Sequence, residues 1–429
     1  MIAKKLIIAG ILAACVLSAR GQEAKTLSLS EAREIAIKNH PKITAAELIA
    51  LASKQAVREV QSVYYPRITA NVTAVDATAN NTRIAAGGLN NPLILTREAE
   101  GVDVAQVITD FGRSINLSAS AKLHARASAQ NALATRAEIL LALDAAYFEA
   151  LQAQSVLDVA QQTVKTRQVT FDQVNEMAKN KIRSGLDLSF ANVDLGEGKL
   201  LLASARNELQ SAFERLSNLL ADREPRTYLL VDVPTNVVQL PDTMQLVQTA
   251  LNDRPDLVQL RLERDASSRF VRAEKGLNYP TVSAIGSAGV VPLHDSLMRD
   301  NYAAAGVNLS LPIFEGFLFS AREQEAELKS RAAAEDLRDA EDNVIRDVRV
   351  AVLNLNYAAE RMSLTEQVLA SANEAFELAQ ARYNVGSSSI VELTQAQLNQ
   401  TQAQIEESKA KYEYQIRAAI LSFQTGQLR

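Results

Sequence analysis

The stretch Tyr65-Pro66-Arg67-Ile68-Thr69-Ala70-Asn71-Val72-Thr73-Ala74 alternates apolar and polar side chains. Ile68, Ala70, Val72 and Ala74 fall on one side of this alternation, and Thr69, Asn71 and Thr73 fall on the other. A period of two residues is typical of a β-strand with one apolar face. A second stretch, Thr281 to Ala288, follows Tyr279-Pro280 and repeats the pattern with Val282, Ala284, Gly286 and Ala288 on its apolar side. The sequence therefore predicts two strands, each entered through a Tyr-Pro dipeptide.

Each predicted strand has a returning partner. In the second case Ala303, Ala305, Val307, Leu309 and Leu311 alternate with Asn308 and Ser310, whereas the first return strand, near Val102 to Thr109, is less regular. We expect β-hairpins at about 67–112 and 281–316. Pro66 to Gly112 spans 46 positions and Pro280 to Gly316 spans 36, so the first hairpin loop should be about ten residues longer.

The chain contains the same plan twice. Pro41 precedes Pro66 by 25 positions, and Pro255 precedes Pro280 by 25. Further along, Phe111-Gly112 corresponds to Phe314-Glu315-Gly316, and residues 181–185 correspond to 382–386. Landmarks in one order at nearly constant spacing indicate an internal repeat of about 200 residues. The repeats are predicted at 22–240 and 241–429.

Helices fill the rest of each repeat. A helix opens each half, and the segments 113–183 and 317–384, which contain neither Pro nor Gly, predict long helices of roughly 100 Å. Return helices are expected at about 187–222 and 389–425, with an equatorial segment at about 223–240. Two neighbouring heptad seams on the second long helix, Leu364-Ser371-Leu378 and Leu369-Phe376, suit a curved wall of helices. A soluble helical bundle explains the same stripes equally well.

The strands decide between these alternatives. Their apolar-out, polar-in alternation resembles an outer-membrane β-barrel, but four strands cannot close one. An open sheet in lipid leaves unpaired backbone groups at its edges, so the strands must be pooled with those of other copies. Three copies supply twelve strands. The predicted fold class is thus mainly α with a small β part: a long α-helical barrel plus a four-strand contribution to a trimeric, 12-stranded transmembrane barrel.

Composition argues against chemistry and against nucleic acid. The 45 Lys and Arg against 50 Asp and Glu give a net charge of −5, and the absence of a basic run longer than two residues argues against a nucleic-acid partner. One Cys and three scattered His leave no expected metal site. Gly196-Glu197-Gly198 lacks the third glycine of a dinucleotide loop. We expect no enzymatic activity and no cofactor.

The N-terminus resembles an export signal. Lys4 and Lys5 precede an apolar run to Leu17, and Ala19-Arg20-Gly21 offers small residues for cleavage, which predicts a signal peptide at 1–21. Leu12-Ala13-Ala14-Cys15 permits the alternative of cleavage before Cys15 and lipidation of that residue. Either route takes the protein out of the cytoplasm.

Taken together, several phrases resemble the TolC family of outer-membrane efflux proteins over essentially the whole mature chain. They are Asn39-His40-Pro41, Arg254-Pro255-Asp256-Leu257, the two Tyr-Pro dipeptides, Leu311-Pro312-Ile313-Phe314-Glu315-Gly316 and Ala381-Arg382-Tyr383-Asn384-Val385-Gly386-Ser387. The resemblance implies a homotrimeric channel in the outer membrane of a Gram-negative-type bacterium, with a helical barrel reaching across the periplasm. Its implied partners are outer-membrane lipid, a periplasmic adaptor (membrane fusion protein), and an inner-membrane pump or ABC transporter.

The resemblance also assigns residues at the helix tips. Ser184-Gly185-Leu186 and Val385-Gly386-Ser387 match the turns that meet the adaptor in the family, and each Gly is expected to supply a left-handed residue. The alternative is that both Gly residues only form the turn. Ser388 stands where the family often has Arg, Gln395 replaces the second of two acids, and Glu392 matches the first acid.

Glu392 would form a ring of three carboxylates at a cation-selective aperture, or else be a solvated helix residue. Asp187 is a second candidate for such a ring. The function expected is the outer-membrane channel of a tripartite efflux or type I secretion system. The alternative is an exported helical scaffold or adaptor without a pore. The sequence assigns neither the cargo nor the class of pump.

Overall fold

The computed structural model describes residues 25–76, 82–83, 93–94, 96–222, 228–235, 241–294, 296 and 299–428. The predicted signal peptide and Cys15 lie outside these residues. The chain divides into two compact units, which are described separately. The first comprises Met1–Thr44, Thr135–Arg254 and Val344–Arg429, and the second comprises Ala45–Ala134 and Pro255–Asn343.

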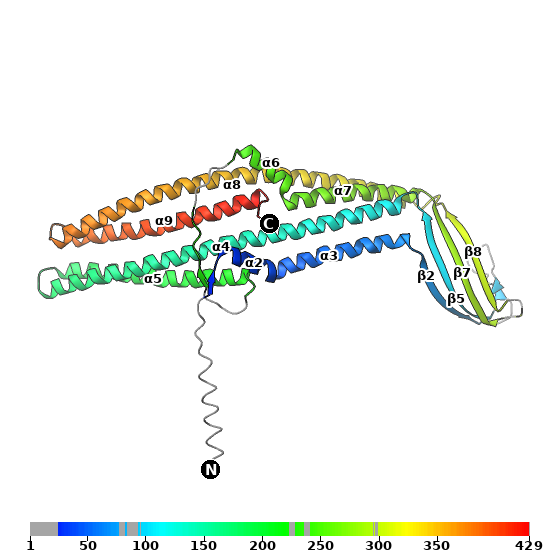
Figure 1. The fold of residues 1–429 in the computed structure, drawn as a ribbon, viewed down its shortest axis with the longest axis horizontal. Coiled ribbons are helices and arrows are strands. Elements are labelled where there is room, and N and C mark those ends of the chain that lie inside the picture. The colour runs from blue at the N-terminus through cyan, green and yellow to red at the C-terminus, as the bar shows by residue number, and fades with distance from the viewer. Residues whose placement is uncertain are drawn as a thin grey trace, which may run out of the picture. The chain divides into compact units, whose positions relative to one another are not determined.

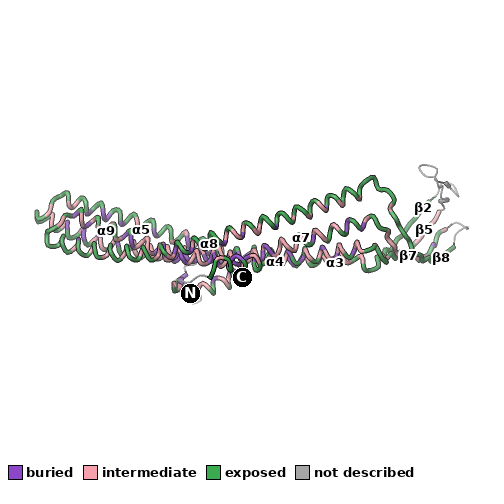
Figure 2. The backbone as a smooth tube through the Cα atoms, turned by 90° about the horizontal axis from the view of Figure 1, so that it is seen from above, coloured by how far each residue is buried: buried purple, intermediate pink, exposed green. Residues whose placement is uncertain are grey.

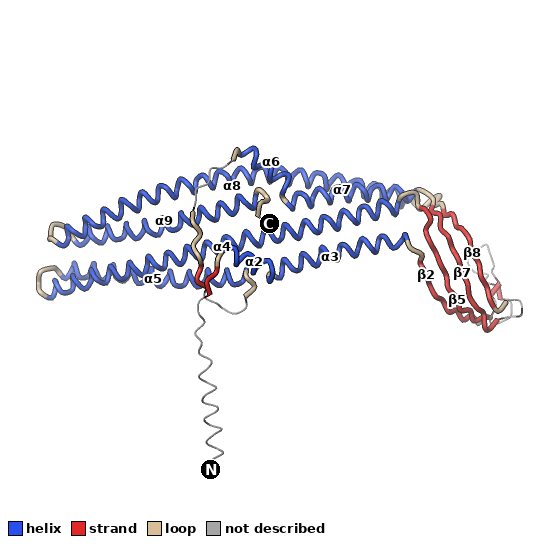
Figure 3. The backbone as a smooth tube through the Cα atoms, viewed as in Figure 1, coloured by secondary structure: helices blue, strands red, loops and turns tan. Residues whose placement is uncertain are grey.

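Long helices and four longer strands account for most of the described chain (Figures 1 and 3). The first repeat contains β1 Lys25–Leu27, α2 Leu29–Asn39, α3 Pro41–Gln61, η2 Ser62–Tyr64, β2 Arg67–Val75, β3 Thr82–Arg83, β4 Leu93–Ile94, β5 Arg97–Thr109, α4 Arg113–Lys179, α5 Gly185–Leu219 and β6 Tyr228–Leu230. The second contains α6 Thr243–Asp253, α7 Pro255–Lys275, η3 Gly276–Asn278, β7 Thr281–His294, β8 Asn301–Ser310, α8 Leu318–Asn384 and α9 Ile390–Gln424.

The two repeats match element by element. Helices α4 and α8 each have 67 residues, and α5 and α9 each have 35. Their first residues are 205 positions apart in both cases, whereas α3 and α7, like β2 and β7, begin 214 positions apart. The offset therefore changes by nine residues within the hairpins, close to the ten expected. The predicted internal repeat is confirmed.

The second unit contains a four-stranded antiparallel sheet in the order β2-β5-β7-β8. Strand β2 pairs with β5 from Arg67 opposite Ala105, and β7 pairs with β8 from Thr281 opposite Ser310. Strands β5 and β7 join the two hairpins, with Ala105 opposite Ile285. Strand β5 begins at Arg97, earlier than the stretch near Val102 that the sequence indicated, because the alternation of its first residues is irregular.

One face of this sheet is mainly apolar, with Glu98, Glu100 and Gln106 of β5 among its exceptions, and it is solvent-exposed. Val72 on β2 and Val307 and Leu309 on β8 are each more than half exposed, and the burial map colours all of β8 as exposed (Figure 2). Asn71, Asp103 and Asn308 belong to the opposite face by strand alternation and register. A sheet with an exposed apolar face and a polar reverse matches the predicted barrel wall.

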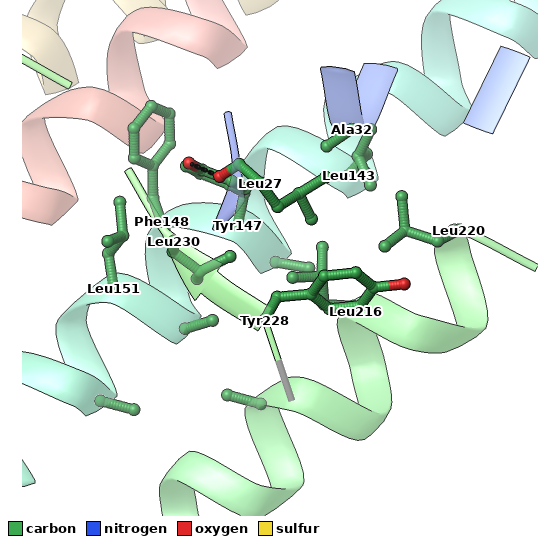
Figure 4. Close-up of a cluster of buried hydrophobic side chains, with 14 of the residues drawn as sticks. Leu27, Ala32, Leu143, Tyr147, Phe148, Leu151, Leu216, Leu220, Tyr228 and Leu230 are labelled. Atoms are coloured by element: carbon green, nitrogen blue, oxygen red, sulfur yellow. Dashed lines mark hydrogen bonds between the residues drawn. The ribbon is translucent and has the colours of Figure 1, made fainter. Parts of the chain in front are cut away.

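The core of the first unit surrounds Tyr147 of α4. This side chain is fully buried with Leu27, Leu143 and Leu216 (Figure 4). Its hydroxyl lies 2.8 Å from the Leu27 carbonyl oxygen and 2.7 Å from that of Val231, and it accepts a hydrogen bond from the Val231 amide. Burial raises the pKa of Tyr147 to about 12. The hydroxyl therefore fastens the short parallel pair β1·β6 onto α4.

Buried ion pairs reinforce both units. In the first, the Arg33 guanidinium binds both carboxylate oxygens of the fully buried Asp144, at 2.8 and 2.5 Å. In the second, Arg322 binds the buried Glu274 at 2.7 and 3.2 Å. A bidentate arginine pair satisfies the carboxylate that burial would otherwise destabilise.

Two classes of feature are not found in the part of the chain that the structure describes. No described helix combines the length and apolar content required to cross a membrane. Among the same residues, no three His, Cys, Asp or Glu side chains gather as metal ligands would.

Candidate functional site: the two helix-tip turns

Two short turns in the first unit carry the predicted docking residues. The first joins α4 to α5 and the second joins α8 to α9. In the first, the Ile182 amide donates to the Met177 carbonyl at 2.9 Å, and in the second the Ser387 amide donates to the Arg382 carbonyl at 2.9 Å. These bonds span five residues and belong to the Schellman motif, which satisfies the last carbonyl groups of a helix. Both long helices thus end in the same way.

The residue at the centre of each motif has left-handed backbone geometry. It is Lys181, with φ of 59°, in the first turn and Gly386, with φ of 76°, in the second. The expectation for Gly386 is confirmed, but the expectation that Gly185 is left-handed is wrong. Gly185 is instead the first residue of α5, because Ser184 caps that helix.

This finding corrects the register of the two tips. With the offset of 205, Lys181 is the counterpart of Gly386, and Gly185 is the counterpart of Ile390. The sequence comparison had placed Gly185 opposite Gly386, four residues out of register. The same correction explains why α4 ends at Lys179, not at 183, and why α5 begins at Gly185, not at 187.

Serine caps open both return helices. The Ser184 hydroxyl accepts a hydrogen bond from the Asp187 amide at 3.1 Å, and the Asp187 carboxylate accepts one from the Ser184 amide at 3.1 Å. This reciprocal arrangement is a capping box. Ser389 accepts from the Glu392 amide at 3.3 Å. Asp187 and Glu392, the two predicted aperture acids, therefore occupy the same third position of their helices.

The two acids have different partners. Asp187 is engaged by the cap, whereas the Glu392 carboxylate lies 3.0 Å from the Arg382 guanidinium across the second turn. Both members of this ion pair are about half exposed, so solvent weakens it. Glu392 thus has a cation beside it that the sequence did not predict.

A direct contact ties the first turn to the second. The Arg183 guanidinium carbon lies 4.5 Å above the centre of the Tyr383 ring, and its Nη2 donates to the Tyr383 carbonyl at 3.3 Å. A cation over an aromatic face is attracted by the ring quadrupole. Arg183 is the counterpart of Ser388, so the arginine absent from the second turn is present in the first.

Tyr383 anchors the apolar cluster under both turns. It is 2% exposed and packs with Val174, Ile390 and Leu393. Burial raises the pKa of the Tyr383 phenol, Arg183 opposes this shift, and Asp187 adds to it. The Tyr383 hydroxyl has no hydrogen-bond partner among the described residues.

Above this cluster the tips present apolar side chains to solvent. Val385 is 80% exposed, Ile182 71% and Leu186 66%. No described atom lies within 4 Å of the position that a Cβ would take at Gly386. Three exposed apolar side chains on two adjacent turns form a surface suited to another protein.

A buried polar pair lies farther from the tips. Arg167 of α4 binds the carbonyl oxygen of Asp194 at 2.7 Å and its carboxylate at 2.9 Å. A Cβ on Gly198 would lie 3.1 Å from the Arg167 Cδ, so this glycine makes room for the arginine. Burial raises the pKa of Asp194 to about 6, with Arg167 opposing and Glu197 adding to the shift. Within the Gly196-Glu197-Gly198 phrase, Gly198 thus has a packing role.

Sequence reasoning missed Lys181, Ile182, Arg183, Tyr383 and Arg382 as tip residues with distinct roles. Arg382 and Tyr383 stand inside the phrase that carries the family resemblance, but nothing in that phrase says what they contact. An ungapped alignment of 111–221 with 316–426 would have paired Lys181 with Gly386, since every later element keeps the same offset.

Known sequences match this chain over most of its length. A family described as "Outer membrane efflux protein" matches residues 32–222 and 246–427. The outer membrane protein TolC of Salmonella enteritidis is 24% identical over 294 residues, covering 66% of this chain and 60% of that protein. TolC of Vibrio cholerae is 23% identical over 414 residues, covering 92% and 90%. The chain spans about 60% of the length of the first two curated relatives that it matches.

Solved structures show the same fold. The Campylobacter jejuni CmeC outer membrane channel superposes with a TM-score of 0.81 at 16% identity, covering 93% of this chain and 85% of that one. The outer membrane protein VceC of Vibrio cholerae gives 0.78 at 17% identity, covering 93% and 96%. At these identities the likeness concerns the fold, namely a helical barrel with a strand contribution.

Proposed function

Because the chain belongs to the outer membrane efflux protein family, we propose that it is the outer-membrane channel of a tripartite efflux or type I secretion system. It resides in the outer membrane, extends into the periplasm, and conducts substrates delivered by a periplasmic adaptor and an inner-membrane pump or ABC transporter. It catalyses no reaction itself. The observation that carries this proposal is the four-stranded sheet, whose mainly apolar face is exposed and whose two edge strands have no partner on their outer sides among the described strands.

The sheet supports a homotrimer. Unpaired backbone groups in lipid are destabilising by several kcal/mol each, and a closed barrel removes them. Three copies of four strands give an even-numbered barrel of twelve, above the minimum of eight. The polar face of each sheet then lines the lumen, and the apolar face contacts lipid.

A trimer and conductance test separates this function from the alternative of a scaffold without a pore. We expect the mature protein, extracted from the outer membrane in detergent, to run as a trimer in native mass spectrometry. In planar bilayers it should give single-channel currents. A soluble periplasmic monomer without conductance would instead support the scaffold.

The helix tips support docking of the adaptor. Val385, Gly386 and Ser387, together with Ser184, Gly185 and Leu186, lie on or beside the two turns, and Ile182 adds a further exposed apolar side chain. Their surface is open in the described chain, and the cross-tie between Arg183 and Tyr383 holds the turns in one arrangement. A rigid, exposed apolar patch is what the tip of a partner's helical hairpin would bury.

Introducing bulk at the tip tests docking. Gly386→Trp should abolish efflux while leaving the yield of trimer unchanged. Gly386→Ala reproduces the backbone strain without the bulk, and Gly196→Trp adds the same bulk on α5 at another exposed glycine with no described atom within 4 Å of its Cβ position. Both controls should retain efflux. Efflux by the Gly386→Trp variant would leave the tip glycine with a turn role only.

The N-terminal processing is part of the same proposal. Cleavage after residue 21 gives a soluble N-terminus, and cleavage before Cys15 gives a lipid anchor in addition to the barrel. The intact mass of the mature protein distinguishes the two, because acylation adds the mass of the fatty acids and retains residues 15–21. The cargo follows from the pump, so identification of the inner-membrane partner assigns the substrate class.

A further inference from the structure

The sheet ends in two edge strands whose outer sides have no partner among the strands that the structure describes. Strand β2 is one edge and β8 the other. All ten residues of β8 are exposed, and Val72 and Leu309, one on each edge, are 72% and 64% exposed. Free edges of this kind pair with other strands. The pairing inside the chain indicates which strand is the partner of each edge, and in which register.

The two hairpins have identical internal registers. Arg67 lies opposite Ala105 in the first, and Thr281 lies opposite Ser310 in the second. Moving the first pair by the repeat offsets, 214 for the outgoing strand and 205 for the returning strand, gives the second pair. Strand β7 is therefore the structural counterpart of β2, and β8 is the counterpart of β5, residue for residue.

The seam between the hairpins shows how one hairpin joins the next. Returning strand β5 pairs antiparallel with outgoing strand β7, from Glu100 opposite Val290 to Val107 opposite Ser283, without a register shift between them. The two edge strands are of the same two kinds: β8 is a returning strand, like β5, and β2 is an outgoing strand, like β7. A closed ring of copies brings β8 of one copy beside β2 of the next.

Resting on the proposed trimer, we propose that β8 pairs antiparallel with β2 of a second copy in the register of the β5·β7 seam. Applying the offsets to that seam places Leu309 opposite Val72 of the partner subunit. It also places Asn308 opposite Thr73 of the partner subunit and Val307 opposite Ala74 of the partner subunit. The occupant of both edges is thus another copy of this chain.

Side-chain chemistry agrees with this register. Leu309–Val72 and Val307–Ala74 join apolar residues on the lipid-facing side, and Asn308–Thr73 joins polar residues on the other. A slip by one residue would place Leu309 opposite Thr73 and turn one strand's apolar set to the wrong face. A slip by two keeps the faces, but it departs from the register that the chain itself uses at β5·β7.

Paired cysteines test the register. Directly opposite strand residues have Cα atoms about 4.5 to 5.5 Å apart, whereas diagonal neighbours are about 7 to 8 Å apart, beyond the usual reach of a disulfide. In the full-length protein, Leu309→Cys with Val72→Cys and Asn308→Cys with Thr73→Cys test two adjacent positions, of which one is a non-hydrogen-bonded pair. Leu309→Cys combined with Ala70→Cys or with Ala74→Cys tests a slip of two residues in either direction. Each single variant controls for links to Cys15.

We expect mild oxidation in isolated outer membranes to convert an in-register pair into covalent dimers and trimers on denaturing gels. The yield should exceed that of either slipped pair by about tenfold, since the slipped pairs lie beyond disulfide reach. A native trimer that links preferentially through a slipped pair, or through neither in-register pair, overturns the register while the channel proposal stands. A protein that native mass spectrometry shows to be monomeric overturns both.

Discussion

The two tip turns share a backbone and differ in their side chains. Each ends its long helix with a left-handed residue and opens its return helix with a serine cap, 205 positions apart. Yet the residues at corresponding positions differ: Lys181 aligns with Gly386, Arg183 with Ser388, and Asp187 with Glu392. The turn geometry is therefore set by capping and does not require glycine. The side chains are free to differ, and they do so where the turns meet.

The consequence is a division of roles between the turns. The first supplies the cation, Arg183, and the second supplies the aromatic ring, Tyr383, that receives it. Asp187 has one methylene fewer than Glu392 and reaches back to its own cap, whereas Glu392 reaches across the turn to Arg382. Four sets of substitutions test this division, beginning with the set expected to have the largest effect.

Removal of the Tyr383 ring should destabilise the apolar cluster under the two tip turns. Tyr383→Ala deletes a buried aromatic side chain, which is destabilising by about 3 to 5 kcal/mol at such positions. Because each 1.36 kcal/mol is tenfold, amide hydrogen exchange around Val174 and Leu393 should accelerate at least about a hundredfold. Tyr383→Phe keeps the ring and loses only a hydroxyl without a described partner, so its exchange should stay near that of the unsubstituted protein. Equal acceleration by both variants would contradict the packing role.

Substitution of the two left-handed residues should have opposite effects on the stability of the two turns. Gly386→Ala places a Cβ at positive φ and should destabilise the second turn by about 1 to 2 kcal/mol. Lys181→Gly relieves the same strain and should stabilise the first turn by up to about 1 kcal/mol. Gly185→Ala is the control, because Gly185 has no left-handed φ. Local proteolysis rates at each turn measure the difference, and a stabilised Gly386→Ala variant would refute the assigned geometry.

The two serine caps should differ modestly. Ser184→Ala removes the hydroxyl that accepts from the Asp187 amide but keeps the backbone amide that donates to the Asp187 carboxylate, whereas Ser389→Ala removes the hydroxyl that accepts from the Glu392 amide. Loss of a serine cap is destabilising by about 1 kcal/mol. We expect slower hydrogen exchange in the first turn of α5 than of α9 after the respective change, because the bond to the Asp187 carboxylate is retained. The reverse order would show that the carboxylate of Asp187 adds nothing to its cap.

The smallest effect on stability should come from the exposed ion pair. Glu392→Gln should lower the free energy of unfolding by about 0.2 to 1 kcal/mol, and by less at high salt because salt screens exposed ion pairs. If three Glu392 side chains line the aperture, the same change should reduce cation selectivity, measured as the reversal potential in a salt gradient. Asp187→Asn is measured in parallel, because Asp187 is the second candidate for such a ring and its carboxylate is bound to its cap. An unchanged reversal potential for Glu392→Gln would leave Glu392 with only its Arg382 contact.

The architecture was readable from the sequence because its signals are periodic. Alternation over Ile68 to Ala74 identifies a strand, and matched prolines identify a repeat, without knowledge of any distant contact. The tip register failed for a physical reason. Glycine served as the landmark of a left-handed turn, but the first turn uses Lys181, and Phe111 and Phe317 also have positive φ.

Contacts between distant residues left no sequence signal. Arg183 and Tyr383 are 200 positions apart, and each is an ordinary helix-end residue until the turns are brought together. The pairing of Lys25–Leu27 with Tyr228–Leu230 was missed too, because three residues are too few to show alternation. The Arg382–Glu392 ion pair could have been predicted from the sequence, since the two residues lie at the ends of one short turn.

That short parallel pair has a consequence for the order of biogenesis. Lys25 is opposite Tyr228, so the first strand to emerge on the far side of the inner membrane waits for some two hundred more residues before its neighbour arrives. Closing a loop of that length is entropically unfavourable by about 5 kcal/mol, and long-range pairings form late in folding. The N-terminal strand should therefore remain unstructured, and accessible to periplasmic chaperones, until the whole first repeat has been translocated.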